Sequence, residues 1–144
     1  MNLKTLLKEI GELAYRQKLV NYSAAGTSLD EINGKEIKWY PLLFSSPTGT
    51  HVVKENTTQF ELTLTYVDRL LSDMSNDVDV LSSAISNLEN IVNGVKQIPG
   101  VVSVEDGYTI RNFANTEKMN DSLGGAYANI RITVINEDLC VDVI

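Results

Sequence analysis

The sequence predicts an α+β fold, in which a mainly antiparallel sheet is covered on one face by an N-terminal helix and a central amphipathic helix. Two neighbouring patterns carry this prediction. Residues 60–67 follow the two-residue period of a strand with one face in a core. Residues 77–97 instead repeat apolar side chains every three or four positions, as a helix does. Since each segment has one apolar face to bury, we expect them to cover each other. The unit 57–97 therefore organises the chain.

The strand of this unit has an inner set and an outer set of side chains. The inner set is Phe60, Leu62, Leu64 and Tyr66, and the outer set is Glu61, Thr63, Thr65 and Val67. The apolar stripe of the helix is Val78, Leu81, Ile85, Leu88, Val92 and Val95. Ser75 or Asn76 is expected to cap the first amides, and Pro99 ends the helix near Gln97, with Gly94 weakening the last turn.

Length and composition indicate one globular domain over residues 1–144. The chain has 43% hydrophobic and 22% charged residues. It lacks an apolar run of the roughly 18 residues that a membrane span needs, and its first residues do not form a signal peptide. Cys140 is the only cysteine, so no internal disulfide is expected. We interpret it as a buried, inert thiol of a protein made in a reducing compartment.

The other elements follow in order. Residues 2–19 predict an amphipathic helix, which either docks on its own domain or serves as an arm for a neighbouring subunit. Residues 20–33 read as a loop with one short strand or helical turn, and Asn33-Gly34 favours a hairpin turn. The next strand is either an edge strand or begins just after Pro41. Residues 45–58 predict a long loop or protruding hairpin, which is the first candidate for a contact surface.

The C-terminal part, residues 100–144, predicts antiparallel strands. Asp106-Gly107 is the strongest hairpin signal in the chain. Residues 126–136 alternate as a half-buried strand, and residues 139–144 add a last edge strand.

No catalytic or cofactor motif is present in the sequence, so we expect neither enzyme activity nor a cofactor. His51, the only histidine, lacks the neighbours of a metal ligand. The acids Asp68, Asp73, Asp77 and Asp79 are explained better by a helix start than by a cation site. The net charge of -7 disfavours a surface that grips nucleic acid. It is compatible with an acidic channel wall past which DNA moves, although acidity more commonly serves solubility.

The order of these elements resembles neck proteins of tailed bacteriophages. The segments that carry the resemblance are YPLLF (40–44), FELTLTYVDRL (60–70), the turn Asn76-Asp77 and AYANIRITVI (126–135). The chain looks like a tail-completion, tail-terminator or head-to-tail connector protein. The stretches Thr58–Leu71 and Arg111–Ala128 are similar to structural proteins of crAss-like phages.

This resemblance implies a tail-terminator-like fold and a non-enzymatic virion protein, made in the bacterial host cytoplasm. It further implies a ring of six or twelve copies between portal or adaptor and tail proteins, around the channel that DNA crosses without specific binding. Subunits of such a ring meet head to tail, so each needs two different complementary surfaces. No membrane is involved.

We place one of these surfaces on the loop 45–58 and the first helix, and the other on sheet edges or on the polar segment 114–125. The candidate interface residues are Thr48, His51, Val52, Val53, Lys54, Leu3, Leu7 and Lys118. The alternative is a small intracellular binding domain or regulator, or less favourably a small enzyme. It would need a concave polar pocket, which the sequence does not indicate.

Overall fold

The computed structural model describes residues 1–27, 40–70, 75–113 and 123–136. The helices are α1 (Leu3–Arg16) and α2 (Asp77–Val95). The strands are β1 (Tyr22–Ala25), β2 (Leu42–Pro47), β3 (Val52–Val53), β4 (Thr57–Arg69), β5 (Val101–Val104), β6 (Ile110–Phe113) and β7 (Leu123–Ile135). The predictions for the Asn33-Gly34 turn, Cys140, the last strand 139–144 and Lys118 lie outside the described residues.

Two long antiparallel strands, β4 and β7, form the centre of the sheet. They pair without a break from Thr57 opposite Ile135 to Arg69 opposite Leu123, and we call this pair the central ribbon. Strands β2 and β3 follow one another along the outer edge of β4. Strands β5 and β6 do the same along the outer edge of β7. β1 lies outside β2 and is the one parallel neighbour among these strands. Of the two alternatives for residues 20–33, a short strand or a helical turn, β1 is the strand.

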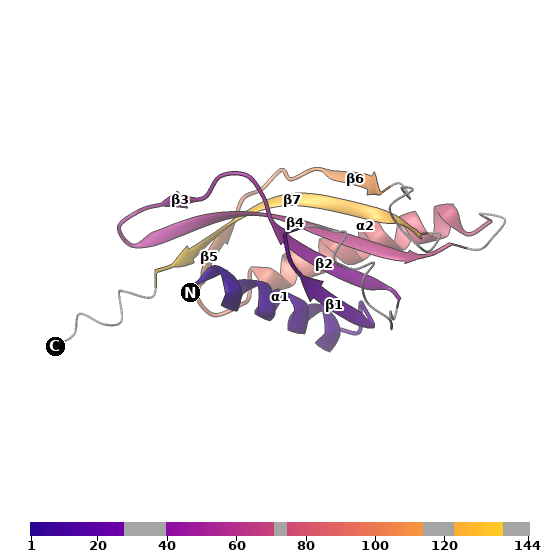
Figure 1. The fold of residues 1–144 in the computed structure, drawn as a ribbon, viewed down its shortest axis with the longest axis horizontal. Coiled ribbons are helices and arrows are strands. Elements are labelled where there is room, and N and C mark those ends of the chain that lie inside the picture. Colours follow the sequence, from indigo (N-terminus) through magenta and orange to yellow (C-terminus); the bar gives the residue numbers. More distant parts are fainter. Residues whose placement is uncertain (28–39, 71–74, 114–122, 137–144) are drawn as a thin grey trace.

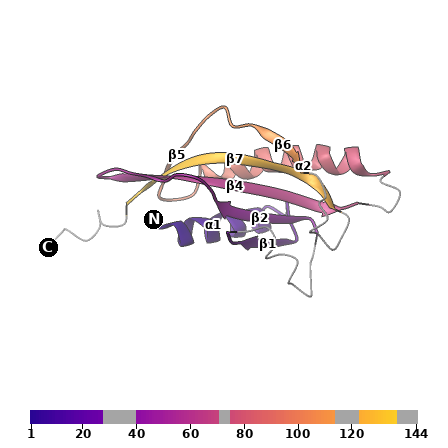
Figure 2. The ribbon, with the colours of Figure 1, turned by 45° about the horizontal axis from the view of Figure 1, so that its top comes forward.

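Both helices pack on the same face of this sheet, which confirms the predicted α+β class (Figures 1 and 2). The buried cluster between them contains Leu6 and Ile10 of α1 and Leu88 and Ile91 of α2. The inward side chains of β4 and β7 complete it, among them Leu62, Leu64, Tyr66, Ala128, Ile130 and Ile132. The inner set predicted for residues 60–67 is thus correct, although Phe60 is only half-buried.

α1 begins where the sequence predicts and ends three residues earlier. The Asn2 side chain accepts a hydrogen bond from the Thr5 amide at 2.8 Å, which caps the helix. After Arg16 the chain leaves the helix through Lys18, whose φ of 59° is left-handed. The helix docks on its own sheet, which was the first of the two predicted alternatives; the other was an arm for a neighbouring subunit.

α2 buries a stripe displaced from the predicted one. Val78 is 71% exposed, so its assignment to the buried face is wrong, and Val80 and Ala84 take that place. The Asn76 side chain forms no capping bond and instead donates to the Arg69 carbonyl at 3.2 Å. Gly94 has a packing role that the sequence did not predict: a Cβ there would lie 2.8 Å from a methyl carbon of Leu13. The last turn of α2 therefore lets α1 approach closely.

Two strand predictions are corrected by backbone pairing. The loop expected from residue 45 starts later, because Ser45 and Ser46 are buried in β2 and pair with β4. The Asp106-Gly107 hairpin is wrong, because β5 and β6 do not pair with each other. Both pair with β7, whose 13 residues offer an edge long enough for two consecutive short strands.

The helix-free face of the sheet is not uniformly polar. A second buried cluster lies there, formed by Leu42, Phe44, Val67 and Leu123. Thr65 is buried as well. The outer set predicted for β4 therefore faces water only toward the start of the strand, around Glu61 and Thr63.

Candidate interaction site

Both edges of the central ribbon are interrupted at the same level, where Glu61 of β4 pairs with Arg131 of β7. On the β4 edge, residues 48–51 separate β2 from β3. On the β7 edge, residues 105–109 separate β5 from β6. Where an edge is interrupted, the amides and carbonyls of the ribbon strand have no neighbouring strand to bond to. Other groups of the chain, water or a partner must then bond to them.

The interruption on the β4 edge is closed by the chain itself. The Thr48 amide donates to the Glu61 carbonyl at 2.9 Å, and the Glu61 amide donates to Nδ1 of His51 at 3.4 Å. The His51 ring also meets Phe60 edge to face, with 5.5 Å between ring centroids. The histidine therefore substitutes for the missing strand neighbour, which is a structural role.

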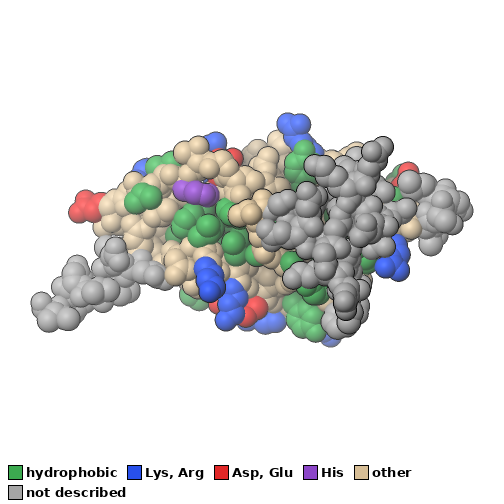
Figure 3. Space-filling view, viewed as in Figure 1, with side chains coloured by type: hydrophobic (Ala, Val, Ile, Leu, Met, Phe, Trp, Pro, Cys, Tyr) green, Lys and Arg blue, Asp and Glu red, His purple; other side chains and the backbone are tan. Residues whose placement is uncertain are grey.

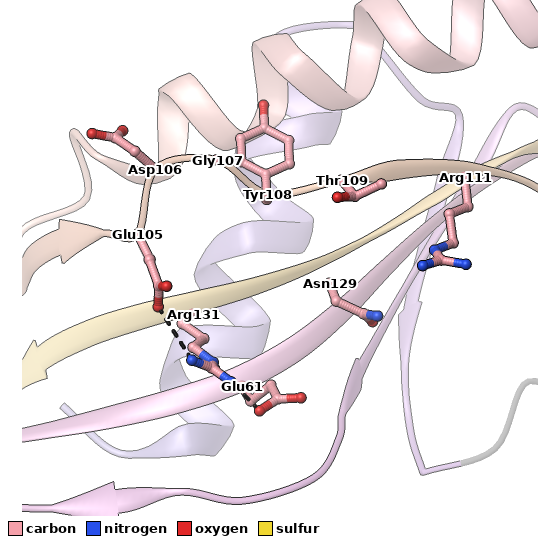
Figure 4. Close-up of a pocket in the computed structure, with 9 residues that line it drawn as sticks. All are labelled: Glu61, Glu105, Asp106, Gly107, Tyr108, Thr109, Arg111, Asn129 and Arg131. Atoms are coloured by element: carbon pink, nitrogen blue, oxygen red, sulfur yellow. Dashed lines mark ion pairs between the residues drawn. The ribbon is translucent and has the colours of Figure 1, made fainter.

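The interruption on the β7 edge remains open. A hollow of about 400 Å³ lies there, lined by residues 105–109 and by Glu61, Arg111, Asn129 and Arg131. Figure 4 shows the last four side chains on one side of the sheet, whereas Tyr108 points toward α2. The sequence did not indicate this concave polar site.

Arg131 is held between two carboxylates at the wall of the hollow. Its Nε lies 3.6 Å from Glu61 and its Nη1 lies 3.6 Å from Glu105 (Figure 4). The Glu105 amide also donates to the Arg131 carbonyl at 2.9 Å. The side chains of Arg131 and Glu105 are 53% and 52% exposed and that of Glu61 is 26% exposed, so solvent screens both pairs, which contribute about 0 to 1 kcal/mol each. Among the described residues, neither Asp106 nor Arg111 has an ion-pair partner.

Asn129 is oriented by a threonine of the neighbouring strand. The Thr63 hydroxyl donates to Oδ1 of Asn129 at 2.5 Å and lies 3.3 Å from the Thr48 hydroxyl. The amide nitrogen of Asn129 is thereby left as a donor. Arg111 pairs opposite Tyr127, two positions from Asn129 on the same face of β7. Two hydrogen-bond donors thus line the hollow together.

A rigid hairpin is the second feature of this region. β3 and the start of β4, joined by residues 54–56, extend past both helices at one end of the molecule (Figures 1 and 2). We call residues 52–58 the β3–β4 hairpin. The Asn136 side chain donates to the carbonyls of Lys54 and Glu55 at 2.9 and 3.3 Å, and its backbone amide donates to Asn56 at 3.0 Å. The Thr58 hydroxyl bonds to Oδ1 of Asn136.

The structure brings five of the eight predicted interface residues together. Thr48, His51, Val52, Val53 and Lys54 all lie on or beside the β3–β4 hairpin. Figure 3 shows the histidine at the surface beside hydrophobic side chains. Val52 and Val53 are 42% and 75% exposed.

The remaining predicted residues lie elsewhere. Leu3 and Leu7 are half-buried on α1 and pack against the main core, and Lys118 lies outside the described residues. Sequence reasoning missed Arg111, Asn129 and Asn136. Alternation in residues 126–136 put Asn129 and Arg131 on an outer face, but no local pattern indicated that the edge beside them is interrupted.

Two tyrosines on the helix side have shifted acidity. Burial raises the pKa of Tyr66, while its hydrogen bond from Nδ2 of Asn87, at 3.0 Å, opposes the shift. Burial also raises the pKa of Tyr108, and the charge of Glu89 adds to the effect. Both hydroxyls remain protonated near neutral pH, which suits structural roles.

The described residues contain neither a metal-binding cluster nor a membrane-spanning helix. No group of three or more His, Cys, Asp or Glu side chains there is arranged to hold a metal ion. Within the same residues, neither helix combines the length and apolar character needed to cross a membrane. Neither a protein-family model nor a curated protein matches the chain.

Proposed function

We propose that this chain is a structural virion protein of a tailed bacteriophage, forming a homo-oligomeric ring in the head-tail connector or tail neck. The ring, of six or twelve copies, would contact portal or adaptor and tail proteins and surround the DNA channel. DNA would pass through the lumen without specific binding, in keeping with the net charge of -7. The protein has no enzymatic role in this proposal.

The observation that carries the proposal is the β3–β4 hairpin. It extends beyond the helices, exposes Val53 to 75% and is nevertheless held by the hydrogen bonds of Asn136. Hydrogen bonds that order a projecting turn oppose the entropy of a free loop. A fixed projection that exposes two valines beside polar and charged residues suits a contact with another protein.

The fold supports the same proposal. Helices cover one face of the sheet, so the part of the helix-free face around Glu61 and Thr63 and the open part of the β7 edge are available for neighbours. Different surfaces at the hairpin end and along the β7 edge meet the requirement of head-to-tail association. The order of helices and strands resembles that expected for the neck proteins.

Light scattering combined with electron microscopy of the purified full chain tests this proposal. We expect a discrete multiple of the chain mass and ring-shaped particles. Changing Val53 to Ser should lower ring formation without unfolding the domain. Val78→Ser is the matched control, because Val78 is 71% exposed on α2, away from the hairpin. Equal losses of assembly in both variants would argue against a hairpin contact.

The alternative is a small binding domain or regulator, favoured by one observation. The hollow of about 400 Å³ is a concave polar site of the kind that such a domain needs. A chain that stays monomeric at every concentration, both alone and in its producing cells, would favour this alternative over the ring.

A further inference from the structure

The hollow on the β7 edge and the tip of the β3–β4 hairpin carry matching unpaired charges. At the hollow, Arg111 and Asp106 have no ion-pair partner among the described residues. On the tip, Lys54 and Glu55 are adjacent and exposed, and within the same ranges they form no ion pair either. Each surface therefore presents one positive and one negative side chain that form no ion pair with the rest of the described chain.

We infer that the tip of the β3–β4 hairpin of one copy binds in the hollow of a second copy of this chain. Glu55 would approach the guanidinium of Arg111 and the amide nitrogen of Asn129, and Lys54 would approach Asp106 at the rim. This inference rests on the proposed self-assembly and specifies its contact. It assigns a binding role to Arg111, Asn129 and Asp106.

The donors in the hollow favour a carboxylate. Arg111 offers only donors, and Asn129 offers its amide nitrogen because Oδ1 already accepts the Thr63 hydroxyl. Glu61 and Glu105 pair with Arg131, and among the described residues neither pairs with Arg111. A guanidinium beside an amide donor is complementary to a carboxylate such as that of Glu55.

The tip is ordered before it binds. Asn136 donates to the carbonyls of Lys54 and Glu55 and thereby fixes the backbone that carries both charges. Because this backbone is already held, binding loses less conformational entropy than the docking of a free loop would. The occupant must bring an acidic and a basic side chain together on a narrow projection, and this chain's own hairpin does so.

The geometry of the contact determines the type of assembly. Tip and hollow are different surfaces on one subunit, so the contact is head to tail. An open assembly keeps one free tip at one end and one free hollow at the other until a ring closes. The chain carries a net charge of -7, which opposes self-association unless local charges match. Charge matching at this contact also explains how an acidic chain recognises itself.

Charge reversal with rescue tests the contact on the full chain. Glu55→Lys and Arg111→Glu should each lower the self-association constant about tenfold or more in sedimentation equilibrium. The chain that carries both changes should recover most of this loss. The controls are Lys96→Glu, at an exposed residue directly after α2, and Asp79→Lys, at an exposed residue of α2. They make the same changes in net charge and should have little effect.

Cysteine crosslinking provides a readout independent of affinity. In a Cys140→Ser background, the variant with both Glu55→Cys and Arg111→Cys should form a disulfide-linked ladder under a mild oxidant. Each single-cysteine variant should stop at the dimer. Circular dichroism would verify that every variant is folded.

The outcomes separate this contact from the proposed function. Rings with unchanged association in Glu55→Lys and Arg111→Glu, and without a ladder, would overturn the contact and leave the ring standing. A wild-type chain that neither assembles nor gives a ladder would overturn both. Reversal, rescue and a ladder together would establish the contact.

Discussion

The two edges of the central ribbon differ at the same level of the sheet. On the β4 edge, the segment between β2 and β3 supplies His51 and Thr48, which bond to both backbone groups of Glu61. On the β7 edge, the segment between β5 and β6 bonds to the Arg131 carbonyl and leaves a hollow of about 400 Å³. One interruption is filled from within the chain, and the other stays open.

This difference indicates which edge is available to a partner. A closed interruption protects a strand against pairing with other chains, whereas an open one offers donors and acceptors to a neighbour. The residues that close the β4 edge belong to the segment that was expected to make contacts. His51 is therefore a structural residue of its own sheet, and the projecting tip beyond it is the part free to bind.

The largest expected effect comes from breaking the ribbon that both edges share. A Cβ on Gly125, whose φ is 148°, would lie 2.0 Å from the Tyr66 carbonyl oxygen. Gly125→Ala should therefore lower the free energy of unfolding by about 3 kcal/mol or more. Urea denaturation measures this change.

Gly107→Ala is the matched control for this prediction. Gly107 also has a positive φ, of 79°, but no atom lies within 4 Å of a Cβ built there. Its loss should stay near 1 kcal/mol, the cost of the left-handed backbone alone. Similar losses in both variants would show that the close approach of β7 to β4 is not required.

The next effect should be confined to the β4 edge. Asn136→Ala removes the hydrogen bonds to Lys54, Glu55 and Thr58 and should lower the free energy of unfolding by about 2 kcal/mol. Amide hydrogen exchange should accelerate at residues 52–58 and remain unchanged at residues 101–113. Asn90→Ala, exposed on α2, should leave both regions as they are. Faster exchange on both edges would contradict an independent hairpin.

A smaller loss of stability is expected from a substitution on the helix side of the sheet, away from both edges. Tyr66→Phe removes the hydrogen bond from Asn87 to the sheet and should lower the free energy of unfolding by about 1 kcal/mol. Tyr15→Phe, at a tyrosine that is 63% exposed, is the control.

The raised pKa of Tyr66 adds a pH dependence to this prediction. Below the ordinary pKa of 10.0, Tyr66 is protonated in both the folded and the unfolded chain. Above it, the unfolded chain loses the proton first, so the free energy of unfolding falls as the pH rises toward the higher pKa of the folded state. The fall should be smaller in Tyr66→Phe than in the wild type. Equal slopes would argue that the buried hydroxyl is not responsible.

Removing His51 should make the β4 edge behave like the β7 edge at little cost in stability. His51→Ala removes the acceptor of the Glu61 amide and should lower the free energy of unfolding by about 1 kcal/mol or less. Exchange of the Glu61 amide should accelerate, because the β4 edge then opens as the β7 edge does. Arg131→Met breaks the exposed ion pairs at the same level and should change stability by under about 1 kcal/mol, without affecting that amide.

Local patterns predicted the elements that depend on near neighbours in sequence. Alternation in residues 126–136 predicted β7 correctly, and Pro41 predicted the start of β2. The helical period found α2 but displaced its buried stripe to Val78, because apolar residues occur on more than one face near its start. The Asp106-Gly107 turn failed because a strand signal does not say which strand it will pair with.

Of the candidate site, only the hairpin residues, which are neighbours in the sequence, could be predicted. Val52, Val53 and Lys54 were identified from a polar stretch between strands, and the structure brings them onto one hairpin. Arg111 and Asn129 were not identified, because their proximity follows from the pairing of β6 with β7. The role of Asn136 likewise depends on residues about 80 positions earlier.

The local spacing of apolar side chains is sufficient to predict an α+β domain with two amphipathic helices and long alternating strands, because this spacing depends only on near neighbours in the sequence. Tertiary structure alone decided that β5 and β6 share the β7 edge, and that the interruption between them stays open while that on the β4 edge is filled by His51. The physical reason is that backbone hydrogen bonding allows any free strand edge to accept any strand. The long-range packing of the whole sheet selects among those pairings.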